Sequence, residues 1–81
     1  MAQPAVASVR PAEGHRLLLE FDNGESRQLD VKPYIRGSWY GRLADPAYFS
    51  TAHVVDGGRT VAWADGQDIA PHELYELSVS V

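Results

Sequence analysis

The residues best placed by type and spacing to carry out chemistry lie in His72–Glu76, which reads His-Glu-Leu-Tyr-Glu. In a helical His-Glu-x-x-His motif, two imidazoles four residues apart bind zinc and the glutamate acts as a general base. Here Glu76 stands where the second histidine is required, and His53 would have to serve as a distant further ligand. We therefore interpret the segment as a helix that starts at Pro71, with acidic residues that complement its dipole. A small metallohydrolase is the weakest function considered.

The segment Asp65-Gly66-Gln67-Asp68 brings two carboxylates close together in the sequence, as a calcium loop would. An EF-hand loop needs ligands at alternating positions and a glutamate at its twelfth position, and this segment lacks that spacing. A glycine-containing turn explains it better, with the Asp side chains accepting hydrogen bonds from nearby backbone N–H groups. We expect no metal site here.

Nucleophilic catalysis has little support in the sequence. The chain contains no cysteine, which excludes cysteine nucleophiles and disulfides. Its serines do not stand in a Gly-x-Ser-x-Gly context. Gly57-Gly58 lacks the glycine spacing and the following helix of a phosphate-binding loop. We therefore expect no enzyme activity, no catalytic residue and no cofactor.

Two large aromatic residues, Trp39 and Tyr40, stand between glycines in the segment Gly37–Gly41. Aromatic side chains are favoured at the centre of protein interfaces because they bury much area at low entropic cost. A small domain also uses its aromatics to cover one end of its sheet. The covering role is favoured for Tyr40, and for Trp39 the two interpretations stay open. Trp39 and Tyr40 are thus the candidate interaction surface.

Short strands joined by tight turns must position these residues. The segment His15–Phe21 alternates with period two, which is typical of a strand with one buried face. The residues expected on that face are His15, Leu17, Leu19 and Phe21. Asn23-Gly24 follows, a strong hairpin signal because both residues tolerate positive φ. The return strand is expected over Glu25–Val31.

Further strand signals flank this hairpin. A strand is expected over Val6–Arg10, with its turn at Pro11–Gly14. A second hairpin is expected to join Val54-Val55 to Thr60–Trp63 through Asp56-Gly57-Gly58. The sheet is therefore expected to be mostly antiparallel.

Two helix starts complete the pattern. Asp45-Pro46 places an N-cap acceptor before a proline at the first helical position. Pro71 opens a second helix, in which Leu74 and Leu77 are spaced to face the sheet. The sequence predicts one α+β domain over residues 1–81: a small, mostly antiparallel sheet built from hairpins, with one or two short helices packed on it.

Length and charge limit the function classes. The 81 residues, 44% hydrophobic, suit one globular domain. No apolar run approaches the ~20 residues of a membrane helix, and the first residues do not resemble a secretory signal, so we expect a cytoplasmic protein without membrane contact. The net charge of −4 lies wholly in residues 41–81, which hold two basic and six acidic residues. Nucleic-acid affinity depends on Lys and Arg contacts to phosphate, so direct binding of nucleic acid is disfavoured.

Several phrases occur in a characteristic order. They are Leu19-x-Phe21-x-Asn23-Gly24-Glu25, Leu29-Asp30-Val31-x-Pro33, Leu43-x-Asp45-x-x-x-Phe49, Val61-x-Trp63-x-x-Gly66-x-Asp68-Ile69 and Pro71-x-x-Leu74-Tyr75-Glu76. Together they resemble the bacterial domain of unknown function family 2442 over about residues 6 to 77. The resemblance implies a small α+β domain in a bacterial cytoplasm, with no established activity and no catalytic residue to carry over. Trp63-Ala64-Asp65-Gly66 departs from the Trp-Pro-Asn-Gly usual in that family, a change that should still support a turn.

The resemblance also implies two kinds of setting. Some relatives are fused to a helix-turn-helix domain, and others stand beside another small protein in a toxin–antitoxin-like arrangement. The leading hypothesis is a non-enzymatic protein-interaction module, which binds another small protein or itself through exposed sheet edges. The alternative is an accessory to a nucleic-acid-binding transcriptional regulator, which the acidic charge opposes.

Overall fold

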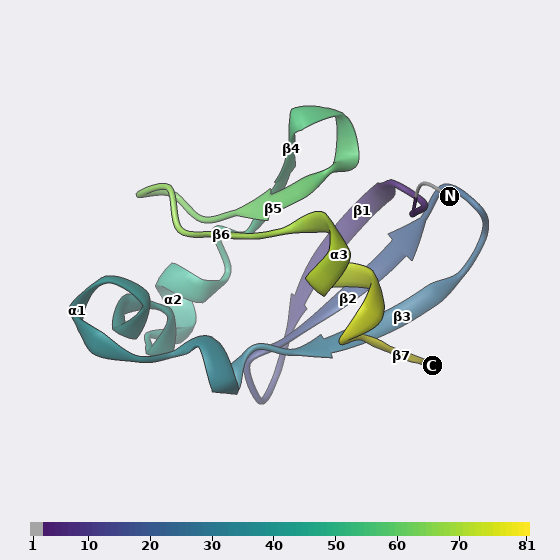
Figure 1. Ribbon diagram of the computed structural model, residues 1–81. Helices are drawn as coiled ribbons and strands as arrows, with labels where there is room; N and C mark the ends of the chain where they lie inside the picture. The colour runs from purple at the N-terminus through teal and green to yellow at the C-terminus, as the bar shows by residue number, and fades with distance from the viewer. Residues whose placement is uncertain (1–2) are drawn as a thin grey trace.

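The computed structural model describes residues 3–81 and holds two antiparallel sheets (Figure 1). The first has the strand order β1-β2-β3-β7 and the second β4-β5-β6. The strands are β1 (Val6–Ala12), β2 (Arg16–Phe21), β3 (Ser26–Asp30), β4 (His53–Val55), β5 (Thr60–Ala62), β6 (Asp68–Ile69) and β7 (Val79–Ser80). The predicted α+β class is confirmed, with the strands divided between two sheets.

Short helical segments connect and cover the sheets. Those of the described residues are η1 (Lys32–Tyr34), α1 (Gly37–Tyr40), η2 (Gly41–Ala44), α2 (Pro46–Phe49), η3 (Asp56–Gly58) and α3 (Pro71–Glu76). Figure 1 shows α1 and α2 together at one end of the molecule, and α3 between the second sheet and β7. None is long enough to be stable alone, so packing holds each of them in place.

The first hairpin follows its sequence pattern closely. Leu17, Leu19 and Phe21 are buried, and Leu17 pairs with Leu29 across β2 and β3. Gly24 has a φ of 90°, and the Phe21 N–H donates to the carbonyl oxygen of Glu25 at 2.9 Å to close the turn. The predicted hairpin is confirmed.

Two details at the other end of β2 differ from the prediction. Pro11 lies inside β1, which tolerates a proline because β1 is an edge strand. The turn therefore begins only at Glu13, and His15 belongs to it with a φ of 56°. His15 is half-buried, and its ring stands edge-on to Phe49 with 5.3 Å between ring centroids.

The second hairpin, β4 to β5, also forms as predicted, and its η3 turn lies against the start of β1. Gly58 has a φ of 92°, and a Cβ atom built on it would lie 2.5 Å from the carbonyl oxygen of Val6. The close contact between this turn and β1 requires a residue without a side chain.

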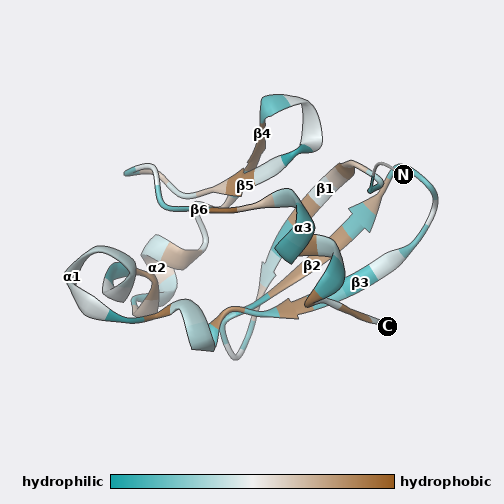
Figure 2. Cartoon of the chain, viewed as in Figure 1, coloured by the Kyte–Doolittle hydropathy of each residue, from teal (hydrophilic) through white to brown (hydrophobic). Residues whose placement is uncertain are grey.

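The core lies between the two sheets and the helices. Figure 2 shows hydrophobic colour on the strands that face one another. The buried apolar residues are Val6, Leu17, Leu19, Phe21, Leu29, Val31, Leu43, Phe49, Val61, Ala62, Trp63, Ile69 and Leu74. The predicted helix start at Asp45 is confirmed, since its carboxylate accepts a hydrogen bond from Ala47 N at 3.1 Å.

The C-terminal helix differs from the prediction in one residue. Leu74 is fully buried, whereas Leu77 is 60% exposed. Helix α3 ends at Glu76, and the chain then turns into β7, so the spacing that would bring Leu77 onto the sheet is interrupted. The prediction that both leucines face the sheet is therefore wrong for Leu77.

Candidate interaction surfaces

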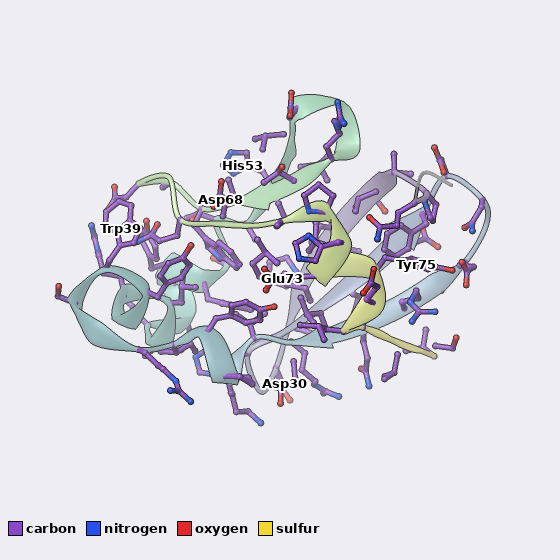
Figure 3. The ribbon with its side chains drawn as sticks, viewed as in Figure 1. Asp30, Trp39, His53, Asp68, Glu73 and Tyr75 are labelled. Carbon is purple, nitrogen blue, oxygen red and sulfur yellow. The ribbon has the colours of Figure 1, made fainter. Side chains whose placement is uncertain are left out.

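The first candidate surface is the Trp39 region on α1 (Figure 3). The Trp39 side chain is 49% exposed, while its backbone oxygen accepts a hydrogen bond from Gln67 Nε2 at 2.9 Å. Tyr40 is half-buried, and its hydroxyl donates to the backbone oxygen of Asp68 at 2.9 Å. The two neighbours thus differ: Tyr40 ties α1 to β6, and Trp39 presents its indole to solvent from a fixed backbone.

The residues considered as a calcium loop form a turn instead. Trp63 N donates to the Gln67 backbone oxygen at 2.8 Å, and Gly66 occupies the turn with a φ of 103°. The Asp65 carboxylate pairs with the guanidinium of Arg42 instead of the nearby backbone N–H groups that the sequence suggested. The predicted turn is confirmed. The predicted partner of Asp65 is wrong, because its carboxylate pairs with Arg42 and not with the backbone.

Gln67 is the residue that sequence reasoning missed in this turn. Its side chain is fully buried, where Oε1 accepts from the Tyr48 hydroxyl at 2.7 Å and Nε2 donates to Trp39 O. Because the oxygen and the nitrogen of this buried amide are both hydrogen-bonded, the Gln67 side chain links α1, α2 and the turn. The one signal in the sequence for the burial of Gln67 was its position between two large apolar residues, Trp63 and Ile69, both of which are buried.

The residues of the zinc-like motif are not brought together. His72 is exposed, and its Nε2 lies 3.9 Å from Glu73 Oε2. Glu76 accepts a hydrogen bond from Gln3 Nε2 at 2.9 Å. His53 lies on β4 and not on α3, and its Nδ1 is 2.9 Å from the Thr51 backbone oxygen. Within residues 3–81, no three His, Asp or Glu side chains gather as a metal ion would require.

The second candidate surface is at the end of the first sheet. We call Leu77, Val79 and Val81 the C-terminal apolar edge; their exposures are 60%, 56% and 72%. Strand β7 pairs with β3 and forms the outer strand of that sheet. Arg27 holds it in place, because its guanidinium donates to the Ser78 backbone oxygen at 2.6 Å and to Ser78 Oγ at 2.8 Å. The alternation Ser-Val-Ser-Val was the sequence signal for this strand.

A cavity of about 450 Å³ adjoins this edge; we call it the Tyr34 cavity. Its lining consists of Leu29, Asp30, Pro33, Tyr34, Glu73 and Leu77. The Tyr34 hydroxyl donates to Glu73 Oε1 at 2.6 Å and joins η1 to α3. Burial, together with this bond to a carboxylate, raises the pKa of Tyr34 well above its usual range. Glu73 therefore adds a carboxylate to the mainly apolar lining of this cavity, whereas the Asp30 carboxylate points away from Glu73 in Figure 3.

The fold and these surfaces define a small α+β domain built from two hairpins, with apolar side chains open at one sheet edge. The chain belongs to the family described as a protein of unknown function, DUF2442, whose model matches residues 6–80. This confirms the resemblance seen in the sequence. No curated protein and no solved structure matches the chain. Within residues 3–81, every helix is too short or too polar to cross a membrane.

Proposed function

We propose that this chain is a non-enzymatic protein-interaction module that binds a second protein along the C-terminal apolar edge. The observation that carries the proposal is the exposure of Leu77, Val79 and Val81 beside the outermost strand of the first sheet. An edge strand presents unpaired backbone groups that can pair with an added strand. Exposed apolar side chains add about 25 cal/mol for each Å² that a partner buries.

The two edges of the first sheet are protected differently, and this supports the choice of β7. On the opposite edge, β1 carries Arg10 and Pro11, and its start lies against the turn at Gly58. Charged residues, prolines and covering loops are the devices that keep edges from pairing with other chains. The segment Leu77–Val81 contains neither a charged residue nor a proline. The β7 edge is thus the one suited to strand addition.

The Trp39 region would serve as a second contact for the same partner or for another one. Trp39 and Tyr40 were the residues that the sequence indicated, and the half-exposed indole suits an interface anchor. Tyr40 contributes through its bond to Asp68, which fixes the backbone that presents Trp39.

Capture from the native cell with tagged protein at low and high salt tests this function, combined with light scattering for self-association. We expect a stoichiometric protein partner, or a dimer, whose binding is lost in Val79→Lys and retained in Ala7→Lys. Both substitutions place a lysine on an exposed position of an edge strand, but on opposite edges.

Three outcomes would overturn the proposal. The first is a monomer that recovers no protein, and the second is equal binding by the Val79→Lys and wild-type chains. Recovery of nucleic acid that is lost on adding salt would favour the alternative role beside a transcriptional regulator.

A further inference from the structure

We infer that the partner at the C-terminal apolar edge is a second copy of this chain, and that Ser80 of one copy pairs with Ser80 of the other. In this dimer the two β7 strands run antiparallel across a two-fold axis and join the first sheets of both copies into one sheet. The inference rests on the function proposed above, because it uses the same edge and names the partner that binds there.

The direction of the Ser80 backbone is the first argument. The Val81 N–H donates to the carbonyl oxygen of Ser26, next to β3, at 3.2 Å. Along a strand, the N–H and carbonyl groups of successive residues point alternately to one side and the other. Ser80, which lies opposite Arg27 on β3, therefore directs its N–H and carbonyl away from the sheet. Within residues 3–81 no strand lies beyond β7, so these two groups are open to an added strand.

The neighbouring outward residue, Ser78, is already engaged within the chain. Its backbone oxygen accepts from the Arg27 guanidinium at 2.6 Å, its hydroxyl accepts from Arg27 Nε at 2.8 Å, and the residue is 2% exposed. Ser80 is exposed. The register that uses the groups of Ser80 places the two-fold axis at this residue. The Ser80 N–H of each copy then donates to the Ser80 carbonyl of the other.

The side chains on either side of Ser80 suit this axis. The segment Val79-Ser80-Val81 reads the same in both directions, and a two-fold contact requires a surface that is complementary to itself. Val79 of one copy lies opposite Val81 of the other, as a non-hydrogen-bonded pair with Cα atoms about 4.5 Å apart. Both valines are more than half exposed in the single chain, so this pairing covers apolar surface in both copies.

The distribution of charge favours self-pairing at this edge. The chain carries a net charge of −4, so two copies approach most easily where no like charges meet. None of the side chains of Leu77–Val81 is charged. On the opposite edge, β1 carries Arg10 and Pro11, which oppose pairing through charge and through a missing N–H. The β7 edge is thus the one that can accept a copy of itself.

The whole chain tests this inference through its translational diffusion, measured by NMR from micromolar to millimolar concentration. Two hydrogen bonds and two valine pairs bury far less than the roughly 800 Å² per partner of a standard interface, so we expect a weak dimer that forms at the higher concentrations. Ser80→Pro removes the outward N–H without removing a bond to β3, and should weaken self-association about tenfold or more. Ser80→Ala, the matched control, keeps the N–H and should associate like wild type.

Two double variants test the register. Val79→Lys with Val81→Glu places a lysine of each copy opposite a glutamate of the other, whereas Val79→Lys with Val81→Lys places lysine opposite lysine. The first should associate about tenfold more tightly at low salt, and the difference should shrink as salt is added. Net charge alone predicts the opposite order, because two added lysines reduce the charge of −4.

Three results would overturn the inference: a chain that stays monomeric at millimolar concentration, equal association of the two double variants, or wild-type association of Ser80→Pro. If the NMR spectrum shows that Ser80→Pro also detaches β7 from β3, the comparison of the double variants decides.

Failure of this inference is distinguishable from failure of the proposed function. A monomeric chain that captures a different protein through Val79 keeps the interaction function and excludes self-pairing. A monomeric chain that captures no protein overturns both.

Discussion

Two regions of this molecule use the same residue type in opposite ways. Trp63 is 1% exposed, and its Nε1 donates to the Phe49 backbone oxygen at 2.9 Å. Trp39 is 49% exposed, and its backbone oxygen accepts a hydrogen bond from the buried Gln67. In the Trp63 region the side chain itself holds the sheets and helices together. In the Trp39 region the fold holds the backbone and leaves the side chain available, which is the arrangement expected of a binding surface.

The largest expected effect comes from Trp63→Ala. Truncating a fully buried tryptophan should lower the free energy of unfolding by about 3–5 kcal/mol, through lost burial and the cavity left behind. Urea denaturation followed by circular dichroism measures this. Trp63→Phe, which keeps a ring but loses the hydrogen bond to Phe49 O, should cost less; equal costs would mean that packing at this position is unimportant.

The next effect tests the link between the two regions. Gln67→Leu keeps the volume of the side chain but removes its bonds to Tyr48 and Trp39. Leaving these partners unsatisfied should cost about 1–3 kcal/mol in the free energy of unfolding and alter Trp39 fluorescence. Gln28→Leu is the control: Gln28 lies half-buried on β3 and its amide has only one long hydrogen bond, from Arg16 NH1 at 3.4 Å, so the change in stability should be about 0.5 kcal/mol or less.

Trp39→Ala should have a small effect on stability, about 1 kcal/mol or less, because Trp39 is already 49% exposed. The same denaturation measurement checks it. A loss of several kcal/mol would place Trp39 with Trp63 as a core residue and would remove it from the candidate interaction surface.

The smallest effect concerns Tyr34, which is intermediate in burial between the two tryptophans. Its pKa is raised in the folded chain by burial and by the bond to Glu73, so its contribution to stability is fully present below the ordinary tyrosine pKa of about 10. That contribution is lost as the pH rises from there toward the raised value. The melting temperature should therefore fall less steeply above pH 10 in Tyr34→Phe than in wild type. If the melting temperatures of Tyr34→Phe and wild type fall equally steeply above pH 10, the raised pKa of Tyr34 in the folded chain is wrong.

Local patterns in the sequence were sufficient for much of the fold. Period-two alternation and Asn23-Gly24 predicted the first hairpin, and Asp45-Pro46 predicted the start of α2, because each depends on neighbours within a few residues. The exposure of Leu77 could not be predicted, since it depends on where α3 stops and the chain turns into β7. Long-range packing decides such boundaries, and a single sequence does not display it.

The candidate site was predicted only in part. Trp39 and Tyr40 were identified by their residue type, although the exposure of Trp39 was left open. The Tyr34 cavity was not foreseen, because Tyr34 and Glu73 are far apart in the sequence and are brought together where η1 contacts α3. Gln67 was missed for the same reason, as its partners Tyr48 and Trp39 come from two other helices.

The contact between Gly58 and Val6 limits how the sequence can drift over evolutionary time. At Gly58 the positive φ and the 2.5 Å approach to the Val6 oxygen act together, so a side chain is excluded for two independent reasons. Its neighbour Gly57 shares the positive φ but has nothing within 4 Å of its Cβ position, so asparagine is an acceptable replacement there. One position of the pair is free to vary, and the other is fixed by the close contact of the η3 turn with the start of β1.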